Sequence, residues 1–561
     1  METTPPKFFL RFFRGYAHPK LKDSIEGDLI EEYNERLKSR GKASADIRFI
    51  VDVLLLFRPA ILRSFRPNRY STPYGMYKNY FKIAWRTFLK SKGYSFINIT
   101  GLAVGLSACL LIGLYVQHQL SYDRFNEKAD RIFRVNVEIR FGDNHLDLAL
   151  ANPLFGETAK NELPEVEQFT RLHWYGSFLV KKGNENIREG NVAWADSTLF
   201  DVFTLPMISG NPRTALTEPN SIVIAESVAR KYFGRTDVVG ETLTIDNTHS
   251  RKITGVIKDI PSNAHFPFTS FLPMIDNEYA TDPTWAGSQD WSTYLLLKEG
   301  ANADAVVPLL NEMLDRHVGP QLTSVIGKTL DEFNREGNFF RASLTPLTEI
   351  HLHSHRIGDF GNGNIQYVYI FSAIAICILI IAIINFMNLA TARSAHRARE
   401  VGMRKVMGSR QGALMGQFIT ESCLTCAGAM LLALVMTVIA LPSFNLLTGQ
   451  SLTPDLLLMP QAIVALLFVT ILVGVLSGTY PAFYLSAFQP ATVLKGTHGG
   501  NARKSFFRNA LVVFQFSASV ILIAGTLIVF RQLKYIQQKD VGYNRAQLVV
   551  INNTDQIGRS R

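Results

Sequence analysis

Three histidines at alternate positions, His351, His353 and His355, are the side chains in this 561-residue sequence that most suggest a metal site. In a β-strand, residues two apart project to the same face, so the three imidazoles would lie on one side. Imidazole is a common zinc ligand. Because no cluster of acidic residues or cysteines adjoins them, we expect neither a metal nor a cofactor here.

Two shorter motifs resemble reactive sites. Cys423 and Cys426 have the spacing of a redox or zinc motif, but no second pair exists and they adjoin an apolar segment. Residues 327–329 read Gly-Lys-Thr, the end of a phosphate-binding loop, yet Leu322 occupies the position of its first glycine. No Ser/His/Asp set has local motif support. We therefore predict that the chain is not an enzyme.

The segment 391–410 concentrates charge in a pattern that suits a partner protein. Its basic residues are Arg393, Arg397, Arg399, Arg404, Lys405 and Arg410. We expect a short amphipathic helix whose apolar side consists of Val401, Met403 and Val406. Gly402 and Gly408 permit close backbone approach or a sharp turn. Such a helix can transmit a partner's movement into the membrane; the alternative is a basic loop that only satisfies the positive-inside rule.

Five segments without Asp, Glu, Lys or Arg could cross a bilayer as helices, which takes roughly 20 apolar residues. They are residues 97–116, 367–390, 424–441, 462–480 and 511–530. The absence of charge within them argues against an ion-coupled transporter. The sequence predicts a polytopic α-helical membrane protein of about five spans, with a mixed α/β extracytoplasmic domain between spans 1 and 2 and a small α-helical cytoplasmic N-terminal domain.

Charged segments orient these spans. The net charge is +11, and residues 1–96 carry 19 Lys/Arg against 9 Asp/Glu. Segments 391–422 and 488–510 are basic, whereas 442–461 contains no Lys or Arg. The positive-inside rule places the N-terminus and both basic segments in the cytoplasm, and residues 121–366 outside. A basic N-terminal segment could bind nucleic acid, but the span that follows favours a membrane flank, so we expect no nucleic-acid partner.

The N-terminal domain is expected to comprise residues 1–75. Apolar residues recur every fourth position over 21–37 and stop at Gly41, which is typical of an amphipathic helix. The apolar stretch 49–57 is too short to span a bilayer, and we expect it to pack on that helix. Residues 76–96 separate aromatic residues from lysines, which predicts an interfacial helix among membrane lipids; a core helix of the N-terminal domain is the alternative.

The external stretch contains regular strand and helix patterns. We expect strands at 131–141, 221–225 and 241–245. Residues 226–233 are expected to form a helix that Gly234 ends. Alternating strands and helices indicate a folded domain and not a linker.

Several motifs, in order along the chain, resemble the MacB/FtsX-like permease family of ABC transporters. They are Ser221-Ile-Val-Ile-Ala-Glu-Ser-Val-Ala-Arg-Lys-Tyr-Phe-Gly234, Ile384-Asn-Phe-Met-Asn-Leu-Ala390, Arg399-Glu-Val-Gly-Met-Arg-Lys-Val-Met-Gly408, Gln417-Phe-Ile-Thr-Glu-Ser422 and Gly478-Thr-Tyr-Pro-Ala-Phe-Tyr-Leu-Ser486. Residues 15–70 are similar to a cytoplasmic prefix domain of some members. The resemblance covers nearly the whole chain.

The resemblance implies a non-catalytic permease subunit whose cytoplasmic ABC ATPase docks on the segment after span 2. The implied contact residues are Arg397, Glu400, Val401, Gly402, Arg404, Lys405 and Gly408. The expected activity is export or extraction of a substrate at the membrane. The alternative is a mechanotransmitting or signalling subunit that moves its external domain without transport.

The resemblance also implies pairing of membrane halves. Longer members carry the plan of one span, an external domain and three spans twice. This sequence has the first copy and one span of the second, so residues 531–561 are interpreted as the start of a second external domain. The expected partners are a second permease copy or a paralogue, membrane lipids, and periplasmic or outer-membrane components.

Overall fold

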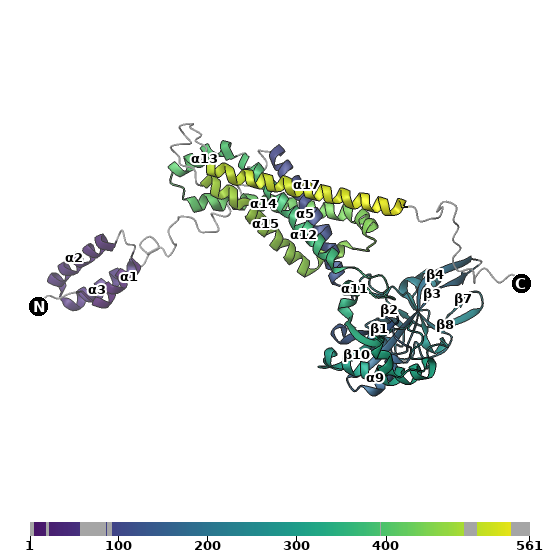
Figure 1. Cartoon of the computed structure of the whole chain (residues 1–561). Helices are drawn as coiled ribbons and strands as arrows, with labels where there is room; N and C mark the ends of the chain where they lie inside the picture. Colours follow the sequence, from purple (N-terminus) through teal and green to yellow (C-terminus); the bar gives the residue numbers. More distant parts are fainter. Residues whose placement is uncertain are drawn as a thin grey trace. The chain divides into compact units, whose positions relative to one another are not determined.

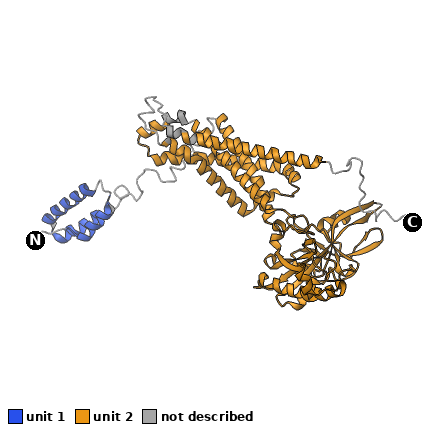
Figure 2. Cartoon of the chain, viewed as in Figure 1, with its two compact units in different colours: residues 1–90 blue, residues 91–561 orange. Residues whose placement is uncertain are grey.

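The computed structural model describes residues 5–17, 22–56, 86, 92–183, 185–392, 394–486 and 502–539. The chain divides into two compact units, residues 1–90 and 91–561 (Figure 2). Most of the interfacial helix expected over 76–96 lies outside the described residues, as do most of the linker expected over 488–510 and the end of the chain after residue 539.

The first unit is a bundle of three helices. They are α1 (Lys7–Tyr16), α2 (Lys22–Arg40) and α3 (Lys42–Leu55). Gly41 separates α2 from α3 with a φ of 79°, a conformation that glycine adopts without strain. Phe13, Leu29, Tyr33 and Phe49 meet in its core. The predicted helix before Gly41 and the predicted packing of 49–57 against it are therefore confirmed.

Among the described residues, five helices of the second unit are long and apolar enough to cross a membrane, which confirms the predicted number of spans. They are α5 (Lys92–Leu120), α12 (Ile365–Ala392), α14 (Gln411–Thr448), α15 (Pro460–Ser486) and α17 (Ala502–Gln538). α5 packs against α12 and α14, and α14 packs against α15 (Figure 1). α12 also contacts α15 and α17.

Small and polar side chains allow these helices to approach closely. A Cβ on Gly105 of α5 would lie 2.7 Å from the Cβ of Ala382 in α12, so only glycine fits at this crossing. The Ser107 and Thr437 hydroxyls, 3.1 Å apart, join α5 to α14. Asn388 of α12 donates to Gln515 of α17 at 3.3 Å.

Between α5 and α12 the chain forms an α/β domain around an 11-stranded sheet. The strands are β1 (Ile132–Phe141), β2 (Asn144–Leu148), β3 (Val166–Lys182), β4 (Glu185–Ala195), β5 (Met207–Gly210), β6 (Ser221–Ala225), β7 (Thr242–Ile245), β8 (His249–Ile257), β9 (Ser270–Pro273), β10 (Ser292–Leu297) and β11 (Phe339–Pro346). Their order is β11-β1-β10-β3-β4-β9-β6-β8-β5, with β2 on β1 and β7 on β3 and β8. The three predicted strands are confirmed as β1, β6 and β7.

Helices cover this sheet and complete two hydrophobic cores. They are α6 (Phe155–Glu162), α7 (Leu199–Val202), α8 (Glu226–Phe233), α9 (Ala303–Ile326), α10 (Leu330–Arg335) and α11 (Ile350–His353). One core joins α6 and α9 to β1, β10 and β11, and the other lies around β6, β8 and β9. α8 has the predicted bounds, and Gly234 ends it with a φ of 70°. The domain begins directly after α5 and returns through α11 to α12.

Candidate functional site

The predicted partner-binding segment folds as helix α13 (Ser394–Val406), at the end of α12 that lies away from the α/β domain (Figure 1). α13 contacts α12 and α15. Gly408 follows it with a φ of 91°. The Gly408 N–H donates to the Lys405 carbonyl and the Ser409 N–H to the Arg404 carbonyl, both at 3.0 Å. This is a Schellman ending, and it fixes the turn into α14, which begins at Gln411.

One face of α13 packs on the span helices. Val401 is 3% exposed and shares an apolar cluster with Leu414, Phe418 and Ala482. Gly402 is buried beside it. This contact joins α13 to both α14 and α15, so a displacement of the helix would displace the spans.

Two predicted contact cations, Arg404 and Lys405, are half-buried and bonded within the chain. Arg404 donates to the Gln417 side chain at 2.6 Å and pairs with Glu400 at 2.7 Å. Lys405 donates to the Ser486 carbonyl at 2.6 Å, at the carboxyl end of α15, where the helix dipole favours a cation. These side chains hold α13 against the spans.

Among the described side chains, apolar residues are exposed at the carboxyl end of α13 and directly after it. Met403, Val406 and Met407 are exposed, Met407 by 76%. The expectation that Val401, Met403 and Val406 form one apolar side is wrong, because residues two and five positions after Val401 lie on a different face of a 3.6-residue helix. Glu400 and Gly408 are also exposed. The Arg397 side chain lies outside the described part of the chain.

A second set of polar contacts lies where the chain leaves α5 and enters α12. The His351 Nε2 lies 2.7 Å from the Gln119 Oε1, and the His351 ring stacks on Tyr122 with centroids 3.3 Å apart. Gly363 covers this contact, since a Cβ there would lie 2.8 Å from both hydrogen-bonding atoms. We term Gln119, Tyr122, His351 and Gly363 the outer clasp.

The predicted histidine strand is wrong. Residues 350–353 form α11, in which His351 is buried, whereas His353 and His355 are exposed. The three imidazoles therefore do not share a face. Burial lowers the pKa of His351 to about 4, so its ring is neutral at pH 7. Within the described ranges, no group of three or more His, Cys, Asp or Glu residues is placed to hold a metal ion.

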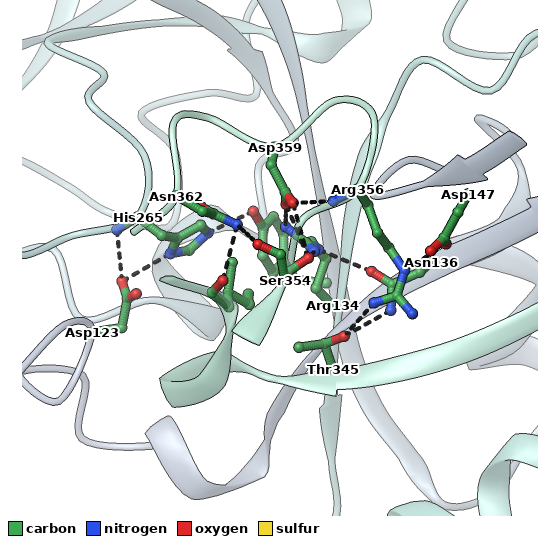
Figure 3. A network of polar contacts seen from close by, with 12 residues as sticks. Asp123, Arg134, Asn136, Asp147, His265, Thr345, Ser354, Arg356, Asp359 and Asn362 are labelled. Atoms are coloured by element: carbon green, nitrogen blue, oxygen red, sulfur yellow. Dashed lines mark hydrogen bonds and ion pairs between the residues drawn. The ribbon is translucent and has the colours of Figure 1, made fainter. Parts of the chain in front are cut away.

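A buried polar network of the α/β domain begins at Asp123, the residue directly after Tyr122 of the clasp (Figure 3). Asp123, just after α5, accepts from the His265 Nδ1 at 2.8 Å, and the His265 Nε2 lies 2.6 Å from the Tyr294 hydroxyl. Because an ionised carboxylate only accepts, the Nδ1–H of His265 donates to Asp123, and one further hydrogen bond joins Nε2 to the phenol oxygen. Burial raises the pKa of Tyr294, which keeps the phenol protonated.

Arg134 continues this network towards α12. It is buried in β1, where it is the cross-strand neighbour of Tyr294. Its guanidinium pairs with Asp359 at 2.5 Å and donates to the Ser354 hydroxyl at 2.6 Å (Figure 3). Asn362 donates to the Ser354 carbonyl at 2.8 Å. Because Asp359 and Asn362 lie shortly before α12, the network ties the second span to the sheet as Asp123 ties the first.

The other two motifs have structural roles. Cys426 is fully buried among the spans. Cys423 packs against Gly474 of α15, where an added Cβ would lie 2.9 Å from the Cys423 sulfur. Gly327 ends α9 with a φ of 69°. Thr329 begins α10 through a capping box with Glu332.

Two family models match the chain. One, described as "MacB-like periplasmic core domain", matches residues 95–312, which include α5 and most of the α/β domain. The other, "FtsX-like permease C-terminal", matches residues 372–490, which include all of α13 and α14. The chain belongs to the MacB/FtsX-like permeases. It is a multi-pass membrane protein with a mixed α/β extracytoplasmic domain.

Two relatives of this MacB/FtsX-like permease illustrate the range of chain length. This chain is 22% identical over 432 residues to the uncharacterized ABC transporter permease YvrN of Bacillus subtilis (strain 168). The aligned part covers 74% of this chain and 98% of YvrN. This chain is also 22% identical over 455 residues to the macrolide export ATP-binding/permease protein MacB of Burkholderia thailandensis, which covers 76% of this chain. That match spans 62% of the MacB protein, less than two thirds of its length.

A solved structure is similar to the α/β domain. The periplasmic region of MacB from Actinobacillus actinomycetemcomitans matches with 17% identity and a TM-score of 0.27, over 40% of this chain and 91% of that one.

The sequence reasoning missed the outward methionine and the buried network. Met407 lies directly after α13 and before Gly408. The helical spacing of apolar residues gives no prediction there, because the helix has already ended. Arg134 and Asn136 alternate with apolar residues in β1, and this alternation was the available signal of a polar inner row.

Proposed function

We propose that this chain is the permease subunit of an ABC transporter, in which a separate cytoplasmic ATPase drives export or extraction of a substrate at the membrane. The observation that carries the proposal is the two-sided structure of α13. Its inner face is bonded to α14 and α15, whereas its outer face presents Met403, Val406 and Met407. An exposed apolar patch beside charged residues is typical of a protein interface.

The proposed ATPase-contact residues differ in burial, and we propose a different role for each group. Glu400 and Gly408 are exposed and, with Met403, Val406 and Met407, form the proposed contact surface; Arg397 remains a further contact candidate. Four residues are proposed to hold the helix on the spans, namely Val401, Gly402, Arg404 and Lys405. A push on the first group would reach the membrane through the second.

The basic segments support an orientation with the N-terminus and α13 in the cytoplasm of a bacterial inner membrane. The proposed partners are the ATPase, a second permease copy or paralogue, membrane lipids, and periplasmic or outer-membrane components. Because relatives are named macrolide exporters, a macrolide is the first substrate to test.

The test is co-purification with ABC ATPases that are co-expressed one at a time with the tagged chain. We expect Met407→Glu to abolish retention of the cognate ATPase, because a carboxylate would be desolvated in an apolar contact. Val325→Glu is the matched control, since Val325 is similarly exposed on the α/β domain. Retention that survives Met407→Glu and Met403→Glu together would contradict the proposed surface.

A second function is supported by the outer clasp and the buried network. These contacts join the α/β domain to both α5 and α12, which suits a subunit that moves its external domain without transport. Proteoliposomes that contain the chain and its ATPase separate the two functions. ATP-dependent macrolide accumulation supports transport, whereas ATP-dependent movement of a fluorophore pair on the α/β domain without accumulation supports mechanotransmission.

A further inference from the structure

The acidic residues of the first unit are unevenly distributed among its helices. α2 carries Asp23, Glu26, Asp28, Glu31, Glu32 and Glu35, together with the basic residues Lys22, Arg36, Lys38 and Arg40. α1 carries Lys7, Arg11 and Arg14 and no acidic residue. The two acidic residues of α3 turn towards α2, where Asp46 accepts from Tyr33 at 2.7 Å and Asp52 pairs with Arg36. The outward sides of α1 and α3 therefore present cations without exposed carboxylates.

The same outward sides also expose apolar side chains beside these cations. Phe8 of α1 is 74% exposed and Ile47 of α3 is 65% exposed. Val51 and Leu54 follow Ile47 at helical spacing and are also exposed. α3 thus has two apolar stripes: one contains Phe49 and Val53 and fills the core, and the other faces outward.

We propose that the outward sides of α1 (Lys7, Phe8 and Arg11) and of α3 (Ile47, Arg48, Val51 and Leu54) bind an anionic lipid headgroup surface. We term these two sides together the basic apolar face. Helices with cations beside exposed aromatic and aliphatic residues lie at the membrane interface, where the apolar side chains enter the acyl boundary and the cations meet lipid phosphates. Each cation near such a surface strengthens binding by roughly five-fold.

The covalent structure favours a bilayer over a protein as the occupant. Residues 57–91 connect α3 to α5, the first span, and a chain of that length reaches at most ~120 Å when extended. The spans therefore keep the unit near a bilayer at a high effective concentration. A second copy that docked through the same face would bring cations against cations, which is unfavourable. Docking of a second copy through α2 is distinguished by the spin–spin broadening measured below. The inference does not depend on the proposed transport function.

The experiment uses the full chain in lipid nanodiscs. A nitroxide is attached at Val51→Cys, after Cys109, Cys377, Cys423 and Cys426 are replaced by alanine. The control label is Asn34→Cys on the exposed side of α2. In nanodiscs of equal parts phosphatidylcholine and phosphatidylglycerol, we expect the label at 51 to be more accessible to oxygen than to a polar nickel reagent, and the label at 34 to remain aqueous. In phosphatidylcholine alone, both labels should be aqueous.

Charge variants test the cause. Lys7→Gln with Arg11→Gln should weaken membrane partitioning by roughly 25-fold, whereas Glu31→Gln with Glu35→Gln on α2 should not weaken it. An unchanged spectrum at position 34 shows that the unit remains folded in each variant. A label at 51 that stays aqueous in anionic nanodiscs would overturn the proposal. Spin–spin broadening in detergent would identify a second copy as the occupant instead, and protection at 51 only after ATPase is added would identify the ATPase.

Discussion

The two ends of the span bundle differ in how they are held together. At the end away from the α/β domain, the described side chains of α13 attach it through an apolar cluster and hydrogen bonds to α14 and α15, and Met403 and Val406 are exposed. At the other end, buried charged and polar residues join α5 and α12 to the sheet. An exposed apolar surface can gain binding energy from a partner, whereas a buried hydrogen-bonded network resists rearrangement.

This difference suggests a division of labour within one chain. A site that a partner binds and releases must be accessible, and its own contacts must be modest. A junction that carries force must keep its geometry when one side moves. We expect substitutions at the end that adjoins the α/β domain, which we call the outer end, to lower stability more than substitutions at the α13 end.

The largest effect is expected from Arg134→Met. It leaves Asp359 buried without its cation, and breaking a buried ion pair in this way costs about 3–5 kcal/mol. Thermal unfolding of the full chain in detergent, followed by tryptophan fluorescence, measures the loss. Arg230→Met is the control, because its ion pair with Glu226 is exposed and contributes under ~1 kcal/mol. An equal loss of stability in Arg134→Met and Arg230→Met would show that the buried ion pair does not stabilise the outer end more than an exposed ion pair does.

The second-largest effect is expected from acid, which should weaken the outer clasp. The folded-state pKa of His351 is about 4, below its ordinary value of 6.5, so the unfolded chain binds the proton more readily. The stabilisation by neutral His351 is complete above pH 6.5 and is lost as the pH falls towards 4, by up to about 3 kcal/mol. Unfolding midpoints at a series of pH values measure this slope. His351→Gln should flatten it and His353→Gln should not; a slope unchanged in His351→Gln would exclude this cause.

Gly363→Ala should have a smaller effect on stability and a clear effect on the clasp. The added methyl would lie 2.8 Å from the atoms of the Gln119–His351 hydrogen bond, and losing a buried hydrogen bond costs about 1–3 kcal/mol. Hydrogen exchange of the backbone around Tyr122 should become faster. Gly190→Ala is the control, because nothing lies within 4 Å of a Cβ at that position. Unchanged exchange in Gly363→Ala would show that the clasp does not hold the two span ends.

The smallest change in stability is expected at the open end. Met407→Ala alters an exposed side chain, so the free energy of unfolding should change by less than about 0.5 kcal/mol. Affinity for the ATPase should fall by roughly ten-fold if Met407 is an anchor of the interface. Val401→Ala should lower the free energy of unfolding because Val401 is buried, and it should change the affinity for the ATPase less than Met407→Ala does. Titration of the ATPase against labelled permease compares the two variants.

The sequence predicted the elements better than their junctions. Long charge-free segments identify spans without tertiary information, and period-two alternation identified β1. β6 was found as a short apolar run between turn residues, and it is buried along its whole length. The outer network could not be found in this way. Asp123 and His265 are 142 residues apart, and Arg134 and Asp359 are 225 apart, so only the folded chain brings them together.

The histidine pattern failed for a related reason. Alternation at three positions fits a strand, but residues 350–353 form a helical turn that turns His351 towards Gln119 and leaves His353 exposed. At α13 the charge pattern predicted a helix with a cationic face. It did not predict that Arg404 and Lys405 bond to the spans, because their acceptors belong to α14 and α15.

The length of α14 has a mechanical consequence. Its 38 residues extend over about 57 Å, whereas the hydrocarbon core of a bilayer is about 30 Å thick. The segment that carries Leu414 and Phe418 therefore stands beyond the apolar layer, with α13 fixed to it. A rod held near its middle acts as a lever. A sideways displacement at the α13 end would appear with opposite sign at the far end, near Thr448, beyond the position where Thr437 meets Ser107 of α5.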